Sequence, residues 1–459
     1  KTSITIDQYL YYQFSTKVEK LMHKKLYDFL ETNDVLFENQ YGFRRGNSTV
    51  HALIKITEEI KNSIENGKYG CGIFIDLRKA FDTVNHKILL QKLEHYGVRG
   101  TALNWFESYL SQRKQFVYII GHSSEMLNIT CGVPQGSVLG PLLFLIYIND
   151  LPNASKILNF FLFADDTNIY YESDDLRKLE KTVNNEMKKL YQWLCVNRLS
   201  LNISKTNFLL FRPYNKHYQD SITVLINGTA ISQKNYVKYL GVLMDSSLTW
   251  NLHIENISKK ISRSIGILYK IKPFVNKIIL RNLYFSIIHP HILYAIQVWG
   301  SSFGLYRNRI LILQKKAVRL LTDMEYYRDG HRLAETTPLF HSLGILKIDE
   351  LFELQVLMLT HDCLNGFAPS SLTQLFTFNS SIHGHSTRSN MTIVSNVVQG
   401  NNNLFIPYAR TSNYGLKSLK SVGPRRWNSI PNNIRNIVSR VSFKITLKKY
   451  LLSRYNLAD

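Results

Sequence analysis

Two adjacent aspartates, Asp165 and Asp166, stand in the middle of residues 160–171, a run that is otherwise apolar and rich in β-prone side chains. The two arms of this run predict a β-hairpin with both carboxylates at its tip. Neighbouring like charges repel by roughly 1 kcal/mol even in water-like surroundings, so a purely structural turn more often contains Asn-Gly or Asp-Gly. The pair alone is compatible with a solvated turn, or with a bound divalent cation that removes the repulsion.

A third acid, Asp76, stands near the end of residues 70–77, a short apolar run that begins with glycines. This pattern predicts a buried strand that delivers one carboxylate at its end. Three carboxylates from a strand end and a hairpin match the needs of two Mg²⁺ ions, which bind a few carboxylates together with waters and substrate phosphates. The predicted chemistry is nucleotidyl transfer, with Mn²⁺ as a possible substitute for Mg²⁺.

The composition favours a folded protein with a polyanionic partner. The chain has 459 residues, of which 45% are hydrophobic and 12% aromatic, and its formal net charge is +22. These values argue against disorder and favour nucleic acid or an anionic membrane as the partner. No apolar run reaches the 18 or more residues that a membrane-spanning helix needs, and the basic residues do not gather on one amphipathic helix, so we expect nucleic acid.

The cysteines and the start of the chain bear on covalent cross-links, on metal sites and on the extent of the sequence. The four cysteines contain no CxxC pair, which indicates neither a disulfide framework nor a zinc site. We therefore expect buried or incidental thiols in a reducing compartment. The chain starts at Lys1 without a signal sequence, so we expect a piece of a longer product, truncated at its amino terminus.

Several elements must position the acids and their substrates. A loop at 40–49 carries Arg44 and Arg45 and leads into a helix from Thr49 to Ile64. The two arginines could clamp a triphosphate or a template backbone, or they could be solvated. After Asp76, the sequence predicts a helix up to about Tyr96 with Asp82 or Thr83 as its N-cap.

Two further segments could contact a nucleotide. Residues 132–141 form a Gly-Pro-rich turn into an apolar helix, which would offer backbone N–H groups to an anion. Lys205 precedes a strand at 207–211 and could protonate a leaving pyrophosphate, or it could be an ordinary surface lysine. From Trp250 to Leu321 the pattern predicts basic helices around an apolar stripe.

These segments together resemble the reverse transcriptase of non-LTR (LINE-type) retrotransposons, close to the jockey and CR1 groups. The resemblance runs from about Gln13 to the end of the chain. It depends on six motifs in order, namely residues 40–49, 74–82, 132–141, 163–166, 201–206 and 239–241.

The resemblance implies a role for each matching residue. Asp76, Asp165 and Asp166 would be the catalytic metal ligands, and Lys205 the general acid. Phe81 would be the steric gate that rejects a ribose 2′-OH. The remaining implied contacts are Gln135 and Gly136 with the nascent base pair, Arg44 and Arg45 with the triphosphate and template, and Tyr239, Leu240 and Gly241 as the primer grip.

The fold implied is α+β, a right hand of fingers, palm and thumb with a ferredoxin-like palm sheet. Residues 1–69 would form part of the fingers, 70–248 the palm with finger insertions and the primer grip, and 249–325 a helical thumb. A mostly helical, basic region would follow at 326–459. The partners implied are an RNA template, a DNA primer or target DNA, and dNTPs, with a location in nucleus and cytoplasm by family analogy.

The chain also departs from the family pattern. Relatives usually carry an Arg-Pro-Ile-Ser-like segment before the first helix, whereas residues 7–12 contain no basic side chain here. The alternative to an active RNA-directed DNA polymerase is therefore a catalytically inactive remnant that still binds nucleic acid.

Overall fold

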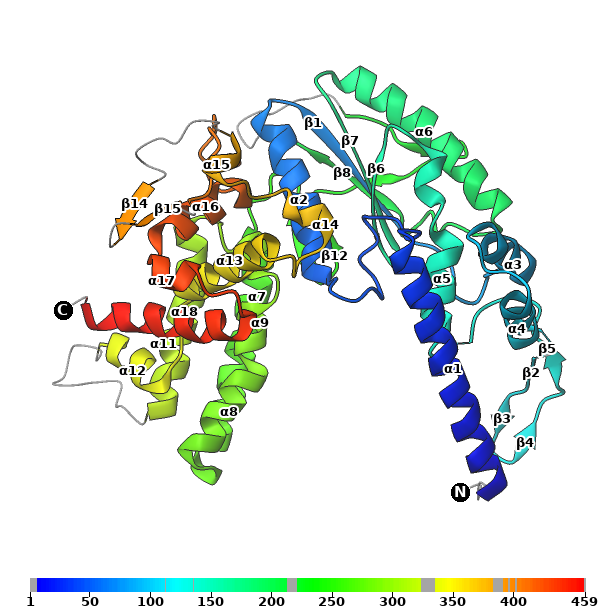
Figure 1. The fold of residues 1–459 in the computed structure, drawn as a ribbon, viewed down its shortest axis with the longest axis horizontal. Helices are drawn as coiled ribbons and strands as arrows, with labels where there is room; N and C mark the ends of the chain where they lie inside the picture. The colour runs from blue at the N-terminus through cyan, green and yellow to red at the C-terminus, as the bar shows by residue number, and fades with distance from the viewer. Residues whose placement is uncertain are drawn as a thin grey trace. The chain divides into compact units, whose positions relative to one another are not determined.

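The chain divides into two compact units, each formed by segments that are not continuous in sequence. The computed structural model describes residues 6–111, 113–134, 136–212, 221–322, 335–382, 391–394, 397–400 and 403–457 (Figure 1). The first unit comprises residues 1–48, 69–210 and 217–234, and the second comprises 49–68, 211–216 and 235–459. Helices and strands occur in both, so the architecture is α+β as expected from the sequence.

The first unit is built on a mixed five-stranded sheet. Its strand order is β11-β8-β1-β7-β6. β1 and β6 both pair antiparallel with β7, whereas β8 and β11 run parallel. The strands of this unit are β1 (Tyr69–Ile75), β2 (Lys114–Gln115), β3 (Tyr118–Ile119), β4 (His122–Ser123), β5 (Leu127–Asn128), β6 (Asn159–Phe163), β7 (Asp166–Ser173), β8 (Asn207–Phe211), β9 (Leu225–Ile226), β10 (Thr229–Ala230) and β11 (Ser232–Gln233).

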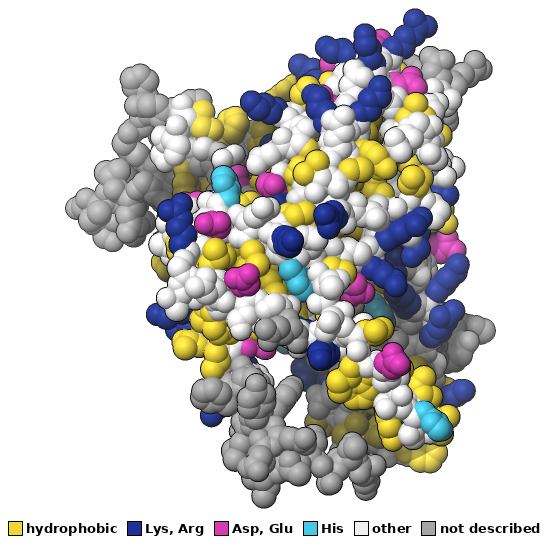
Figure 2. Space-filling view, turned by 90° about the vertical axis from the view of Figure 1, so that its right-hand side faces the viewer, with side chains coloured by type: hydrophobic (Ala, Val, Ile, Leu, Met, Phe, Trp, Pro, Cys, Tyr) yellow, Lys and Arg dark blue, Asp and Glu magenta, His cyan; other side chains and the backbone are white. Residues whose placement is uncertain are grey.

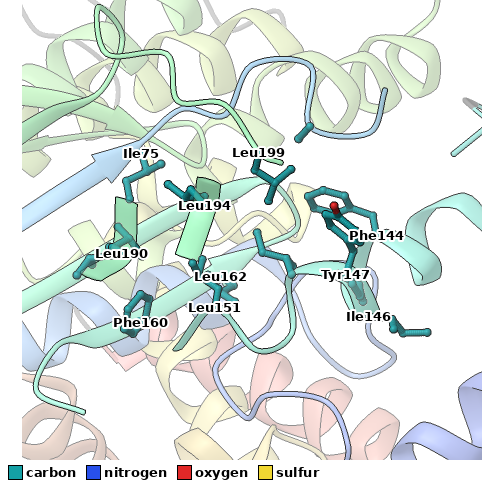
Figure 3. Packing of buried hydrophobic residues seen from close by; sticks show 14 of the residues in the cluster. Ile75, Phe144, Ile146, Tyr147, Leu151, Phe160, Leu162, Leu190, Leu194 and Leu199 are labelled. Carbon is teal, nitrogen blue, oxygen red and sulfur yellow. The ribbon is translucent and has the colours of Figure 1, made fainter. Parts of the chain in front are cut away.

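Helices share a hydrophobic core with this sheet. They are α1 (Ile6–Thr32), α3 (His86–His95), α4 (Thr101–Leu110), α5 (Gly140–Ile148), the short 3-10 helix η1 (Leu151–Ala154) and α6 (Leu176–Val196). α5 is apolar almost throughout and buried along its length, while α6 buries one stripe that includes Leu190 and Leu194. Alternate residues of β1, such as Ile73 and Ile75, enter the same core because side chains of a strand alternate between faces. Figure 3 shows side chains from β1, β6, α5 and α6 gathered in this core.

One helix boundary differs from the sequence-based prediction. We expected Asp82 or Thr83 to cap the helix that follows Asp76, but α3 begins later, and Asn85 is its N-cap. The side-chain oxygen of Asn85 accepts a hydrogen bond from the N–H of Ile88 at 3.1 Å. Residues 78–83 form turns instead, and the N–H groups of Gly132 and Val133 donate to the carbonyls of Val84 and Phe81, which a continuing helix would use for its own hydrogen bonds.

The second unit is mainly helical. Its helices are α2 (Thr49–Glu65), α7 (Asn251–Ile271), η2 (Lys272–Phe274), α8 (Lys277–Ile287), α9 (His289–Leu293), α10 (Ile296–Trp299), α11 (Gly304–Thr322), α12 (Thr337–Leu343), α13 (Ile348–Leu364), α14 (Ser370–Thr373), α15 (Asn379–Ile382), α16 (Leu419–Ser429), α17 (Asn432–Arg435), α18 (Arg440–Ser453) and η4 (Arg454–Leu457). Its strands are β12 (Tyr236–Tyr239), β13 (Val242–Asp245), β14 (Met391–Val394) and β15 (Val397–Gly400).

The helices of the second unit follow the apolar periodicity of the sequence. On α7, Ile254, Ile257, Ile261 and Leu268 are buried, which confirms the apolar stripe expected between Trp250 and Leu321. α13 lies in the interior of the unit and buries most of its side chains. Within the described residues, no helix combines the length and the apolar character that crossing a membrane requires.

Candidate active site

The register of the central sheet brings the three aspartates to one edge of the first unit. β1 pairs with β7 up to Ile75 opposite Thr167. Along an antiparallel pair the residue number rises on one strand as it falls on the other. The next position of this register therefore places Asp76 opposite Asp166. Residues directly opposite each other on antiparallel strands have Cβ atoms about 4.5–5.5 Å apart. The topology therefore brings the end of β1 next to the tip of the β6–β7 hairpin, as the sequence predicted.

Asp165 lies in the turn between β6 and β7. The last pair of this hairpin is Phe163 with Asp166, so Ala164 and Asp165 form a two-residue turn. Ala164 has a φ of +56°, which is unusual for a residue with a side chain. The surrounding structure must therefore hold this turn in place.

Gln40 supplies that support, a role that our sequence analysis missed. Its side-chain oxygen accepts the N–H of Ala164 at 3.1 Å and that of Gly42 at 2.9 Å. Gln40 is only 2% exposed. A side chain on Gly42 would come within 2.4 Å of the Ala164 nitrogen, so glycine permits the close approach. Gln40 is the first residue of the motif at 40–49, whose arginines were the predicted contacts.

A second loop fixes Asp76 from the other side. The N–H of Asp76 donates to the hydroxyl of Thr206 at 3.3 Å, and its carbonyl accepts the N–H of Asn202 at 2.8 Å. The N–H of Arg78 donates to the carbonyl of Ser200 at 2.8 Å. The same loop carries Lys205, whose side chain is exposed. The structure thus places Lys205 and Asp76 on two segments that are hydrogen-bonded to each other.

The three carboxylates repel one another. The pKa of Asp166 is raised above its ordinary value, first by partial desolvation and then by the negative charges of Asp165 and Asp76. Among the described residues, none of the three carboxylates forms an ion pair with a basic side chain. Converging acids without a protein cation provide the oxygen donors and the negative charge that a hard divalent cation binds.

The protein side chains do not complete such a site alone. Within the described ranges, no group of three or more His, Cys, Asp and Glu residues is arranged so that it could hold a metal ion. Mg²⁺ usually takes one or two carboxylates and fills its remaining positions with water and substrate phosphates. The donor set therefore fits Mg²⁺ only as part of a complex with a phosphate-bearing substrate.

Phe81 follows Asp76 by five residues in the sequence, and its ring contacts two other aromatic rings. It stacks on Phe144 of α5 with ring centroids 4.4 Å apart, and it meets Phe43 edge-on at 6.4 Å. Its carbonyl accepts the N–H of Val133 at 2.9 Å, which ties it to the Gly-Pro-rich segment. The ring is partly exposed, so it combines a fixed position with an accessible surface.

The Gly-Pro-rich segment is only partly described. Gln135 lies outside the described residues, whereas Gly136 is exposed with a φ of +85° and open space around its Cα. The N–H of Leu139 donates to the carboxylate of Glu19 at 3.1 Å, and the N–H of Gly140 donates to the Ser137 hydroxyl at 2.9 Å. These two donors at the start of α5, which we expected to face an anion, are therefore occupied.

The two loop arginines differ in environment. The guanidinium of Arg44 forms a bidentate ion pair with Glu31, at 2.9 and 2.7 Å, and donates to the carbonyl of Phe37 at 3.0 Å. Arg45 has a side chain that is 66% exposed, and it reaches Asp28 at 3.5 Å. Arg44 therefore braces its loop against α1, whereas Arg45 keeps most of its surface free.

The three residues predicted to form the primer grip lie in the second unit. Tyr239 ends β12 and is buried, while Leu240 and Gly241 form the turn to β13 with φ values of +42° and +81°. The hydroxyl of Tyr294 donates to the carbonyl of Leu240 at 2.6 Å. The Tyr294 ring lies so close to Gly241 that an added Cβ would be 3.2 Å from it, which explains the glycine.

The surface charge agrees with a polyanionic partner. Lys and Arg side chains are spread over the face seen in Figure 2, with fewer acidic side chains among them. They belong to an excess of 22 positive charges over the whole chain. A surface of this kind attracts phosphate backbones at long range.

Comparisons with known proteins agree with this picture. Residues 11–244 match a family described as reverse transcriptase (RNA-dependent DNA polymerase). The chain is 30% identical over 316 residues to the probable RNA-directed DNA polymerase from transposon X-element of Drosophila melanogaster, covering 67% of this chain and 34% of the relative. It is 28% identical over 341 residues to the RNA-directed DNA polymerase from mobile element jockey of the same species, covering 71% of this chain and 37% of the relative.

The chain spans about a third of the length of these curated relatives. Among solved structures, telomerase from Candida albicans in complex with a fragment of telomeric RNA shows 11% sequence identity and a TM-score of 0.43. That comparison covers 72% of this chain and 62% of the telomerase chain.

The role assigned to Gln40 can be tested by removing its oxygen. Replacing Gln40 by Met keeps the length of the side chain but leaves the buried N–H groups of Ala164 and Gly42 without their acceptor. We expect a loss of about 2–3 kcal/mol in the free energy of unfolding, measured by urea denaturation. Gln233→Met, at an exposed position of β11, is the control. Equal stability of the two variants would show that Gln40 does not support the turn.

The repulsion among the aspartates predicts a pH-dependent effect of Asp166→Asn. Because the pKa of Asp166 is raised in the folded state, its ionisation costs stability at neutral pH and costs nothing below its ordinary pKa of 3.8. The variant should melt about 1–2 °C higher than the parent at pH 7, and this gain should disappear near pH 3. Glu107→Gln, on the exposed side of α4, is the matched loss of charge. A gain that persisted at pH 3 would rule out electrostatic repulsion as its cause.

Proposed function

The chain belongs to the reverse transcriptase (RNA-dependent DNA polymerase) family, and on this basis we propose that it is the RNA-directed DNA polymerase of a non-LTR retrotransposon. It would extend a primer 3′-OH with dNTPs on an RNA template. The similarity to the polymerases of jockey and X-element supports the assignment to this group of elements. Its partners would be the template RNA, a DNA primer or target DNA, and dNTPs.

One observation carries this proposal. Asp76, at the end of β1, continues the β1–β7 register to Asp166, and the negative charges of Asp76 and Asp165 raise the pKa of Asp166. The three acids come from two segments that are about 90 residues apart in sequence. The repulsion among these acids destabilises the folded protein unless a bound cation offsets it.

We assign Asp76, Asp165 and Asp166 to the binding of two Mg²⁺ ions together with the substrate triphosphate. When bound, such ions supply activation of the 3′-OH and stabilisation of the charge on the leaving pyrophosphate. In the reaction, the 3′-oxygen forms a bond to the α-phosphorus of the dNTP and releases its proton to solvent water. The bond from the α-phosphorus to the bridging oxygen breaks, and pyrophosphate leaves with the electron pair.

The other residues of the first unit would position the substrates. Lys205 is exposed on the loop that is hydrogen-bonded to Asp76, so we assign it as the donor of a proton to pyrophosphate. Phe81 is fixed by Phe144 and would stack below the sugar, where a ribose 2′-OH would clash. Gly136 and Gln135 would lie along the nascent base pair.

The arginines and the primer grip complete the proposal. Arg45 is free to contact the triphosphate or the template, whereas Arg44, paired with Glu31, would hold the loop that presents Arg45. Tyr239, Leu240 and Gly241 would hold the primer strand. In the right-hand arrangement, residues 1–69 would belong to the fingers, 70–248 to the palm and 249–325 to the thumb.

Replacing Asp165 by Asn should abolish polymerisation and spare binding. We expect primer extension on an RNA template with dNTPs and Mg²⁺ to fall at least about a thousandfold, because the variant loses a charged metal ligand. Affinity for the primer–template duplex, measured by fluorescence anisotropy, should change less than about twofold, because most of that affinity comes from phosphate contacts. The control Glu107→Gln should extend like the parent. Extension by Asp165→Asn would refute the assignment, and failure of all three proteins with tight binding would favour an inactive remnant.

Replacing Phe81 by Val should relax the choice of sugar. The smaller side chain leaves room for a 2′-OH, so the ratio of kcat/KM for a dNTP to that for the matching rNTP should fall by about tenfold or more. Phe43→Val removes the neighbouring ring that meets Phe81 edge-on and serves as the control. An unchanged ratio in Phe81→Val, with extension of dNTPs intact, would count against a steric gate.

A further inference from the structure

A cleft lies at the start of α11 in the second unit, and apart from Lys61 its lining residues lie outside residues 11–244 that match the family. Two adjoining hollows form it, and they share the turn Ser301–Phe303 and the side chain of Lys417. The first hollow has a cavity volume of about 310 Å³, at the small end of the range for ligand sites. Nothing in the proposed polymerase reaction uses this cleft.

The N-terminus of α11 opens into the cleft. α11 has 19 residues and no acidic side chain in its first turn. The N–H groups of Gly304 and Leu305 have no backbone acceptor among the described residues. The free N–H groups and the positive end of the helix dipole favour an anion at this position.

Basic side chains surround the same point. Lys417 donates to the side-chain oxygen of Asn413 at 3.3 Å and lies 3.6 Å from the centre of the Phe303 ring, without an acidic partner in the described part of the chain. Burial lowers the pKa of Lys417, and the positive charges of Arg307 and Lys61 lower it further. Arg425 lines the second hollow and is exposed.

The acids nearby neutralise only part of this charge. Arg307 pairs with Asp349 at 2.8 Å, and Lys61 pairs with the buried Glu58 at 3.0 Å. Lys417 and Arg425 form no ion pair within the described residues. The cleft therefore keeps two positive charges that a bound anion could satisfy.

Ser302 provides an independent indication of a missing ligand. It lines both hollows and is 4% exposed, and its hydroxyl has no hydrogen-bond partner in the described structure. Buried hydroxyls normally find a partner, so an unmade bond at the wall of a basic cleft is unusual. A phosphate oxygen would be a suitable acceptor.

Aromatic rings stand beside the basic groups. Phe303 is 42% exposed although it follows two buried serines, and Tyr306 meets it edge-on at 5.9 Å. An exposed ring next to a phosphate site offers a stacking surface for a nucleobase. A base inside a duplex could not reach such a ring, so the occupant must have unpaired bases.

We propose that this cleft binds a single strand of nucleic acid. One phosphate lies at the N-terminus of α11 between Lys417 and Arg425 and accepts the hydroxyl of Ser302, and the adjacent base stacks on Phe303. The site adds contacts with a nucleic-acid strand to those made by the polymerase residues. It does not depend on catalysis and can be measured in a chain that cannot polymerise.

The test measures binding of a short fluorescent oligouridylate to the full chain carrying Asp165→Asn, without Mg²⁺ and dNTPs. Lys417→Gln with Arg425→Gln should weaken binding about tenfold at low salt. The slope of log Kd against log salt should fall by about 0.7, because the two side chains share one phosphate contact and each such contact on a single strand contributes about 0.7. Lys444→Gln with Lys449→Gln removes the same charge from exposed positions of α18 and should change the slope little. Phe303→Leu should weaken binding about fivefold or more without changing the slope.

Two further measurements locate the strand and guard against misfolding. Ser302→Ala removes a hydroxyl that has no partner, so it should leave the melting temperature unchanged and still weaken binding. An oligonucleotide containing 4-thiouridine should crosslink to the peptide with Phe303 and Tyr306 in the parent and much less in Phe303→Leu. Equal affinities and slopes in the cleft and α18 variants, with crosslinks only elsewhere, would overturn the proposal. Displacement by inorganic phosphate without any effect of Phe303→Leu would also overturn it, because the cleft would then recognise a phosphate group and not a strand.

Discussion

The mutual repulsion of three carboxylates is the constraint on which the first unit depends. Asp76, Asp165 and Asp166 meet at the edge of a sheet, and burial and like charges together raise the pKa of Asp166. Such an arrangement persists only if the backbone around it is held firmly. The pairing of β1 with β7 provides one part of this support, because it fixes the position of Asp76 relative to the hairpin.

Two loops provide the rest of the support. Gln40 reaches from the segment before α2 to the backbone of Ala164, and residues 200–206 bind the backbone of Asp76 on both its N–H and its carbonyl. The same two segments carry Arg45 and Lys205, which we assign to substrate contacts. The structure therefore couples the placement of the acids to the placement of the groups that would meet the triphosphate.

The sequence predicted the parts that local pattern controls. The hairpin with its two acids, the strand before Asp76, the apolar α5 and the stripe on α7 all follow from periodicity, and the structure contains each of them. The N-cap predicted for α3 was wrong. The backbone before α3 pairs with the segment around Gly132, which is distant in sequence, and this pairing decides where the helix begins. The support by Gln40 and the ion pair between Arg44 and Glu31 were missed for the same reason, since both join segments whose proximity only the fold reveals.

The central claim is that the three aspartates hold divalent cations together with a nucleotide. The most direct measurement is a titration with Mn²⁺ followed by electron paramagnetic resonance, using a chain-terminated primer on an RNA template and the next dNTP. The account predicts that the complex binds Mn²⁺ beyond the amount held by the nucleic acid and nucleotide alone, and that Asp76→Asn removes this excess. An excess of the same size and affinity in Asp76→Asn would contradict the account.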